Sequence, residues 1–159
     1  MMKFLAQAWA AIKVASGPTY AALALADAVS EFNEYVRYNL KRWQNFQFPS
    51  CSYPASVTTC TATLVQSLTG GAGQAQISNV VTDASAYGWG LAIFRDTAAI
   101  TVLDWSKCVD IVYRTGAGTI VTVDSPLKAG TYHYRSVCFD INGNMGVACA
   151  DGSCVVTAN

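Results

Sequence analysis

Apolar residues in the first third of the chain recur with the period of an α-helix. Residues 2–15 are rich in alanine and leucine, and their few polar side chains form one narrow stripe. This pattern predicts a helix that is apolar around most of its circumference. Gly17-Pro18 predicts a break or kink, because proline lacks an amide donor and clashes with the preceding turn. Residues 19–46 then resume the helical pattern.

In this second segment apolar side chains return at steps of three and four, which places them on one helix face. With the first segment they form a predicted assembly face, consisting of Phe4, Leu5, Trp9, Ile12, Leu25, Val29, Phe32, Val36, Leu40 and Trp43. Acidic Glu31 and Glu34 precede basic Arg37, Lys41 and Arg42, an order that matches the helix dipole. The spacing also offers Glu34 a basic partner at Arg37 or Lys41.

After Pro49 the composition changes, with threonine, valine, serine and glycine dominating, and short strands are expected between turn signals. The predicted strands cover residues 56–68, 75–82, 88–95, 100–105, 109–114, 119–123, 132–140, 145–149 and 154–157. Asn142-Gly143 is a strong hairpin signal. The fold class is therefore α+β: a kinked helical segment, residues 1–48, followed by an Ig-like antiparallel β-sandwich, residues 49–159.

Composition narrows the function classes. The 159 residues carry ten basic and ten acidic side chains, and only 13% are charged, against about 25% in typical proteins. No net field would draw the chain to nucleic acid. Hydrophobic residues make up 52%, more than a monomer of this size is expected to hide, so burial against partner subunits is predicted.

All six cysteines follow residue 50, and an even number without metal-ligand spacing favours disulfides over zinc or buried thiols. The disulfide candidates are Cys51, Cys60, Cys108, Cys138, Cys149 and Cys154. Proximity in sequence favours two short loops, Cys51–Cys60 and Cys149–Cys154, with Cys108–Cys138 joining two strands. Sequence alone leaves the other pairings open.

One stretch resembles a known family. Leu127-Lys-Ala-Gly-Thr-Tyr-His-Tyr134, continuing through Val137-Cys-Phe-Asp-Ile-Asn-Gly-Asn144, is similar to the E–F corner, F strand and F–G turn of fibronectin type III and related Ig-like modules. Ala129 stands where that pattern has proline, and tyrosines occupy 132 and 134 instead of 133. The resemblance implies a tyrosine corner, in which a phenol hydroxyl bonds to upstream backbone. It implies no function.

Candidate chemistry is sparse. His133 is the only histidine and lies within a predicted strand, so neither a catalytic triad nor a zinc site is expected. Asp140-Ile-Asn-Gly-Asn144 spaces oxygen ligands as calcium loops do, but it lacks the distal glutamate and is interpreted as a turn. Gly88-Trp-Gly90 lacks the residues of a phosphate loop. We expect no enzyme, cofactor or metal.

Aromatic residues on the predicted strands could form a carbohydrate- or protein-binding face, although core packing and subunit contact are favoured. They are Tyr87, Trp89, Trp105, Tyr113, Tyr132 and Tyr134.

An apolar helical segment joined to a β domain suggests a structural subunit of an extracellular assembly. The helices would dock into a lattice of the same or neighbouring subunits, and the sandwich would be displayed on a virion or extracellular surface. A chain starting near Ser50 should then stay folded and become monomeric.

Two families resemble this plan: phage head-decoration proteins with a helical part and an Ig-like outer domain, and type IV pilins with an assembly helix and a β head. Leu5, Lys13 and the untrimmed Met1-Met2 start favour the virion protein over the pilin-like filament subunit. A carbohydrate- or protein-binding adhesin module is a third alternative. The interrupted apolar run argues against a cleaved signal, and membrane contact by residues 1–15 is a less favoured alternative.

Overall fold

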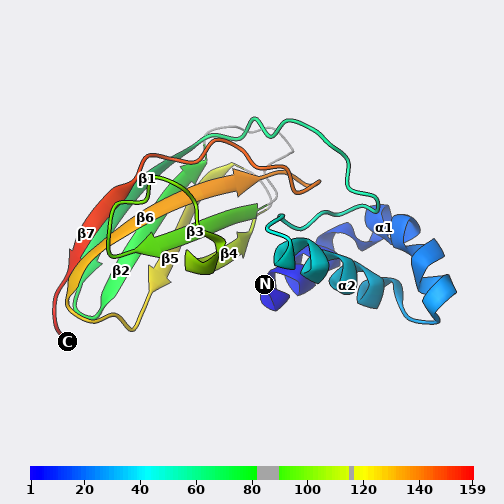
Figure 1. The fold of residues 1–159 in the computed structure, drawn as a ribbon, viewed down its shortest axis with the longest axis horizontal. Coiled ribbons are helices and arrows are strands. Elements are labelled where there is room, and N and C mark those ends of the chain that lie inside the picture. Colours follow the sequence, from blue (N-terminus) through cyan, green and yellow to red (C-terminus); the bar gives the residue numbers. More distant parts are fainter. Residues whose placement is uncertain (82–89, 115–116) are drawn as a thin grey trace.

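The computed structural model describes residues 1–81, 90–114 and 117–159. Two helices precede two antiparallel sheets, which confirms the α+β class with a β-sandwich (Figure 1). The helices are α1 (Met2–Asp27) and α2 (Glu31–Gln44). The strands are β1 (Leu64–Gly71), β2 (Gln74–Val81), β3 (Gly90–Asp96), β4 (Cys108–Tyr113), β5 (Gly118–Asp124), β6 (Gly130–Phe139) and β7 (Gly152–Val156), with a 3-10 turn, η1 (Trp105–Lys107), before β4.

The strand order supports the Ig-like assignment. One sheet has the order β1-β2-β5 and the other has the order β4-β3-β6-β7. If the strands are lettered along the chain, β1, β2 and β5 take the places of A, B and E, and β3, β6 and β7 take those of C, F and G. The remaining strand, β4, pairs with β3 at the edge of the second sheet.

Of the break or kink predicted at Gly17-Pro18, the break does not occur, because α1 continues through Pro18 to Asp27. Ile12, Ser16, Tyr20 and Ala24 are buried at four-residue intervals on both sides of the proline. Burial of this continuous stripe outweighs the backbone hydrogen bond that proline removes. The chain turns instead at Ala28, which adopts the left-handed conformation (φ 54°) and ends α1.

The predicted charge order of the second helix is confirmed. Ser30 caps α2 by accepting a hydrogen bond from the Asn33 amide (3.2 Å), and acidic residues lie in its first turn while basic residues lie in its last. Arg37 pairs with buried Glu34 (2.7 Å) and with Asp27 from the end of α1. The helix therefore begins and ends with groups that satisfy its free backbone ends.

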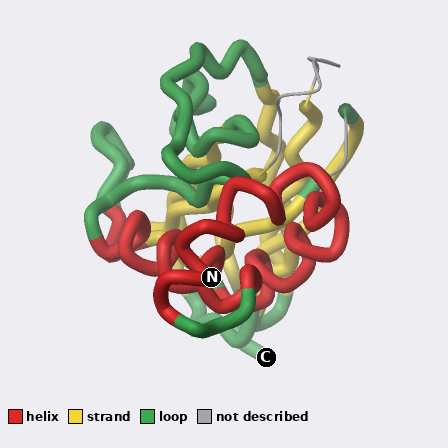
Figure 2. The backbone as a smooth tube through the Cα atoms, turned by 90° about the vertical axis from the view of Figure 1, so that its right-hand side faces the viewer, coloured by secondary structure: helices red, strands yellow, loops and turns green. Residues whose placement is uncertain are grey.

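The helices pack against their own sandwich, contrary to the premise that this domain could not cover them. Phe4, Leu5 and Ile12 share one core with Phe94 and Phe139 of the four-stranded sheet. Both helices lie at one end of the sandwich, in front of the strands in Figure 2. Of the other predicted assembly residues, Trp9, Phe32, Val36, Leu40 and Trp43 are half-buried against this core, and Leu25 and Val29 are exposed.

A second core fills the space between the sheets. It includes Ile77, Leu91 and Tyr134, and the Asp124 carboxylate on β5 links Arg95 of β3 (2.8 Å) and the Tyr134 hydroxyl of β6 (2.9 Å). The expected tyrosine corner is confirmed, since the Tyr132 hydroxyl donates to the Lys128 carbonyl oxygen (3.1 Å).

Six of the nine predicted strands correspond to observed ones, with some parts outside the described residues. The prediction fails for residues 100–105, which form turns and the start of η1, and for residues 145–149, which make only the bridge Phe139↔Met145. Of residues 56–68, only those from Leu64 onward are in a strand. Side chains replace strand partners in these segments: Asn144 donates to the Ser56 carbonyl (3.0 Å) and Arg135 to the Thr101 carbonyl (2.9 Å).

Candidate functional site

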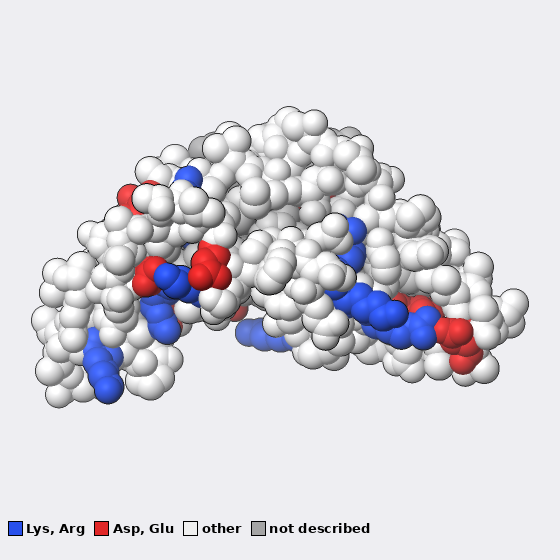
Figure 3. Space-filling model, viewed as in Figure 1, with Lys and Arg blue, Asp and Glu red and all other residues white. Residues whose placement is uncertain are grey.

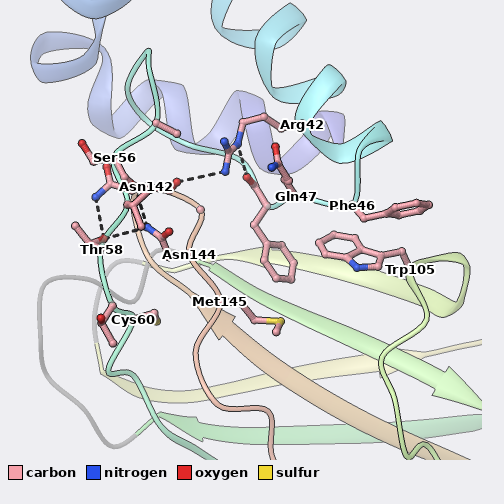
Figure 4. Close-up of a pocket in the computed structure, with 15 residues that line it drawn as sticks. Arg42, Phe46, Gln47, Ser56, Thr58, Cys60, Trp105, Asn142, Asn144 and Met145 are labelled. Carbon is pink, nitrogen blue, oxygen red and sulfur yellow. Dashed lines mark hydrogen bonds between the residues drawn. The ribbon is translucent and has the colours of Figure 1, made fainter.

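A groove of about 610 Å³ lies where the end of α2, the segment before β1, and the turn after β6 meet (Figure 4). Pockets of about 300–1,000 Å³ are typical of small-ligand sites. Its described lining residues are Arg42, Phe46, Gln47, Phe48, the segment 55–60, Trp105, Asn142, Gly143, Asn144 and Met145. These residues come from four separate parts of the chain.

Arg42 is the only charged residue among the described residues that line the groove. Its Nε donates to the Phe48 carbonyl (2.8 Å) and one Nη to the Asn142 carbonyl (3.4 Å). Among described residues no carboxylate lies within ion-pair distance of the Arg42 guanidinium. The guanidinium is therefore oriented by two neutral acceptors, and it also lies over the Tyr38 ring, 5.8 Å from the ring centroid.

The turn from Asp140 to Asn144 forms the opposite side and confirms the interpretation of this stretch as a turn. The buried Asp140 carboxylate accepts from the amides of Asn142 and Asn144 (2.8 Å each) and from the Thr58 hydroxyl (2.5 Å). Gly143 has φ 77°, and a Cβ there would lie 2.4 Å from the Phe48 carbonyl oxygen. Within the described residues no cluster of His, Cys, Asp and Glu is arranged to hold a metal ion.

Two aromatic residues form the end of the groove on the right of Figure 4. Trp105 lies against Trp43 and Phe48, with ring centroids 4.9 and 4.6 Å apart. Phe46 lies beyond the end of α2 with φ 57°, and it is 68% exposed, 6.3 Å from the Trp105 ring. A bulky side chain in the left-handed region is an uncommon and strained arrangement.

Only part of this groove could be predicted from the sequence. The Asn142-Gly143 turn and Trp105 of the aromatic set were expected, but Arg42 and Phe46 were predicted on a continuous helix and Thr58 in a strand. No local signal marks these residues as neighbours, because their meeting depends on how the helices dock on the sandwich.

A second surface is the outer face of β1, β2 and β5. Register places three rows of outward side chains across the strands. The rows are Val65–Val80–Thr119, Ser67–Ser78–Val121 and Thr69–Gln76–Val123. This nine-residue array contains no charged side chain, and its four valines are 40–63% exposed. On the face drawn in Figure 3, most charged side chains lie in the lower half of the molecule, and a few lie at its upper left edge.

The predicted disulfide pairings are not seen in the structure. No disulfide joins the six cysteines, all of which lie in described residues. Cys108 is opposite Phe94 and Cys138 is opposite Leu91, on strands that flank β3 from opposite sides. Two strand spacings of about 4.8 Å each exceed the roughly 7 Å Cα separation that a disulfide allows.

The short-range pairings fail for similar reasons. The Cys149 amide donates to Ser136, whereas Cys154 is opposite Tyr132, four residues or about 13 Å further along β6. Cys51 belongs to the core under the helices and Cys60 to the core between the sheets.

Cys108 and Cys138 also lack the features of reactive thiols. Burial raises the pKa of Cys138 to about 11, although nearby Arg114 opposes the shift. Burial likewise raises the pKa of Cys108 to about 11. Reactive cysteines have lowered pKa values and partial exposure, so these two thiols have the properties of packing residues.

The single histidine lies at the sheet surface. His133 Nδ1 is 2.8 Å from an Asp151 carboxylate oxygen, whose other oxygen accepts from the Ile100 amide (3.0 Å). Tyr132 and Tyr134 pack toward the core between the sheets, as alternation along the strand predicts.

The predicted aromatic face is not brought together among the described residues. Trp105 and Tyr113 belong to the helix-side core, and Tyr132 and Tyr134 pack with the other core. The described residues do not include Tyr87 or Trp89, and of the Gly88-Trp-Gly90 stretch they include only Gly90.

No family model and no curated protein matches the chain. Solved structures that resemble it include an α-L-rhamnosidase of Streptomyces avermitilis complexed with L-rhamnose, at 12% identity and a TM-score of 0.41 over 64% of this chain. The matched part is 11% of the rhamnosidase chain.

Two smaller domains also match. The PKD domain of an M14-like peptidase from a Thermoplasmatales archaeon has 18% identity and a TM-score of 0.35, covering 62% of this chain and 92% of the domain. A CARDB domain from Pyrococcus furiosus has 11% identity and a TM-score of 0.35, covering 65% of this chain and all of that domain (100%). These distant likenesses carry no functional argument, and the resemblance to phage decoration proteins and pilins has no support from them.

Proposed function

We propose that this chain is a non-enzymatic structural subunit of an extracellular assembly, most simply a virion structural or decoration protein. The observation that carries the proposal is the charge-free nine-residue array on the outer face of β1, β2 and β5. The solvated face of an antiparallel sheet is usually polar and includes charged side chains, which limit unwanted association. The centre of a protein–protein interface is, in contrast, depleted of charge.

The geometry of the array suits contact with a neighbouring subunit. Val65 and Val80 are direct cross-strand neighbours, and Val121 and Val123 add exposed apolar surface on β5. Serine, threonine and glutamine side chains between them can form hydrogen bonds across an interface. The surface is therefore apolar enough to associate and polar enough to stay soluble before it does.

This proposal moves the assembly surface from the helices to the sandwich. Most of the predicted helical assembly face is occupied by the chain's own core. The helices then act as a cap on one end of the sandwich, with Leu25 and Val14 (85% and 86% exposed) left as apolar positions on α1. Among the described residues neither helix has the length and apolar character needed to cross a membrane.

A charge placed in the array tests this function. Val121→Lys puts an ammonium in the middle row, where association would have to bury it, so the variant should assemble less. Val102→Lys is the matched control, because Val102 is 79% exposed in a turn outside the array. Sedimentation velocity over a range of concentrations and electron microscopy of native material measure assembly.

The proposal predicts that the unmodified chain and Val102→Lys form the same particles and that Val121→Lys stays smaller. Circular dichroism checks that both variants are folded. Equal assembly of Val121→Lys and the control would remove the array from the interface. The structural-subunit function would be contradicted if the unmodified chain stayed monomeric at all concentrations and if electron microscopy of native material also showed no assembly.

A further inference from the structure

The groove beside Arg42 is not needed for assembly through the array, and its side chains point to a ligand. We propose that it binds an acidic sugar residue of a glycan, with the sugar carboxylate at Arg42 and the sugar ring near Phe46 and Trp105. The proposal stands independently of the assembly function, since the array and the groove share no residue.

The position of Arg42 favours an anion. Its guanidinium is fixed by the carbonyl oxygens of Phe48 and Asn142, and no carboxylate among the described residues is close enough to pair with it. The one nearby acidic side chain in the turn, Asp140, already receives hydrogen bonds from Thr58, Asn142 and Asn144. A guanidinium with remaining N–H donors matches a ligand carboxylate, which it can bind with two parallel hydrogen bonds.

The aromatic end of the groove favours a ring with an apolar face. Phe46 is 68% exposed, and its left-handed backbone holds the ring beside Trp105 instead of in the core. The same conformation ends α1 at Ala28 and here ends α2, where the Gln47 amide donates to the Arg42 carbonyl oxygen (2.9 Å), so the helix end itself places the exposed ring at the groove. The C–H face of a sugar ring can pack on such aromatic surfaces.

The turn on the opposite side supplies partners for hydroxyl groups. The side-chain amide nitrogens of Asn142 and Asn144 bond to Thr58, at 3.2 and 3.0 Å, which holds both side chains in place. Within the described part of the chain their Oδ1 atoms accept no hydrogen bond. These oxygens, together with the exposed Gln47 amide, can bind sugar hydroxyls.

Together these features require three properties in one ligand: a carboxylate, an apolar ring face and several hydroxyls. A uronic or sialic acid residue has all three. A neutral sugar lacks a partner for the Arg42 charge, and a peptide carboxyl terminus lacks the hydroxyl-bearing ring. The groove volume of about 610 Å³ leaves room for more than one sugar unit.

The test uses two acidic probes, a glucuronate-containing tetrasaccharide and the α-methyl glycoside of N-acetylneuraminic acid, each beside its methyl ester. Binding to the full chain is measured by isothermal titration calorimetry and by NMR shift changes. At least one acid should bind about tenfold or more tightly than its ester, because esterification removes the charge that Arg42 would pair.

Two variants separate binding from folding. Phe46→Gly removes the ring but suits the left-handed backbone, so its unfolding midpoint should be unchanged or higher while affinity falls. Arg42→Gln should abolish the difference between acid and ester. Lys41→Gln, which removes a charge one residue away outside the groove, should leave binding unchanged.

The proposal fails if neither acid binds at millimolar concentration, or if the esters bind as well as the acids. It also fails if Phe46→Gly binds with unaltered affinity, or if acetate and a short acidic peptide compete as well as the sugar acids. None of these outcomes bears on whether the array mediates assembly, which is measured without any sugar.

Discussion

Gly70 lies where β1 passes closest to β7, and replacing it with alanine should open the edge of the sandwich. A Cβ at this position would be 1.8 Å from the Val155 carbonyl oxygen and 2.6 Å from its carbonyl carbon. Real Cβ contacts are essentially never shorter than 3.0 Å, and both atoms that it meets belong to backbone. The two strands must therefore separate by more than an ångström, since no side chain can move aside instead.

Two hydrogen bonds close this seam and limit how far it can open. The Gly73 amide donates to Thr157 (2.9 Å) and the Thr157 amide donates to Gly71 (3.1 Å). Overpacking of a well-packed site costs about 1–3 kcal/mol, and each lost hydrogen bond costs about 1 kcal/mol. We expect Gly70→Ala to lower the free energy of unfolding by about 2–4 kcal/mol, and the melting temperature by about 5–15 °C.

The matched control is Gly71→Ala. Its Cβ would lie 3.4 Å from Cγ of the flexible Gln74 side chain, so its free energy of unfolding should change by less than about 0.5 kcal/mol. Urea denaturation measures both variants, and hydrogen exchange should show loss of protection at the Thr157 amide in Gly70→Ala alone. Equal stability of the two variants would refute the close approach of β1 and β7.

Three other predictions follow from burial. Asn79 is fully buried, and neither polar atom of its side-chain amide has a hydrogen-bond partner among the described residues. Asn79→Leu, of similar shape, should therefore raise the free energy of unfolding by about 1–3 kcal/mol, and a lower melting temperature would contradict this. Burial raises the pKa of Cys138 from 9.0 to about 11, so the stability that its neutral thiol contributes is fully present below pH 9 and is lost as the pH rises to 11. In thermal melts, the melting temperature of Cys138→Ala should therefore fall less between pH 9 and 11 than that of the unmodified chain. A chain beginning at Ser50 should unfold or aggregate, because it exposes Phe94 and Phe139, which reverses the expectation from sequence; a soluble, folded monomer in light scattering would show that the helices are dispensable.

Several features could be predicted from sequence because neighbouring residues decide them. The charge order along α2 and the turn at Asn142-Gly143 depend on contacts within a few positions. The tyrosine corner is local as well, since Tyr132 bonds to a carbonyl four residues upstream. Alternation along β6 likewise predicted that Tyr132 and Tyr134 share a face opposite His133.

Tertiary packing decided the features that sequence analysis missed. Pro18 lies inside a helix because the buried side chains on both sides of it belong to one stripe. Tyr20 in this stripe packs against Tyr35 of α2 and donates to the Ser50 carbonyl oxygen, so the residues that cover it come from later segments of the chain. Cys108 and Cys138 are kept apart by β3, and strand order is not encoded by cysteine spacing.

The sequence by itself determined the class of the protein: helices first, then a sandwich of short strands with little charge. Periodicity and turn residues are sufficient for this, because they act over a few positions. Only the tertiary structure decided that the helices cover their own sandwich, that an uncharged array faces outward, and that Arg42, Phe46 and Asn144 border one groove. These arrangements depend on contacts between segments far apart in the chain, and the residues next to a side chain in the sequence do not determine which distant surface it contacts.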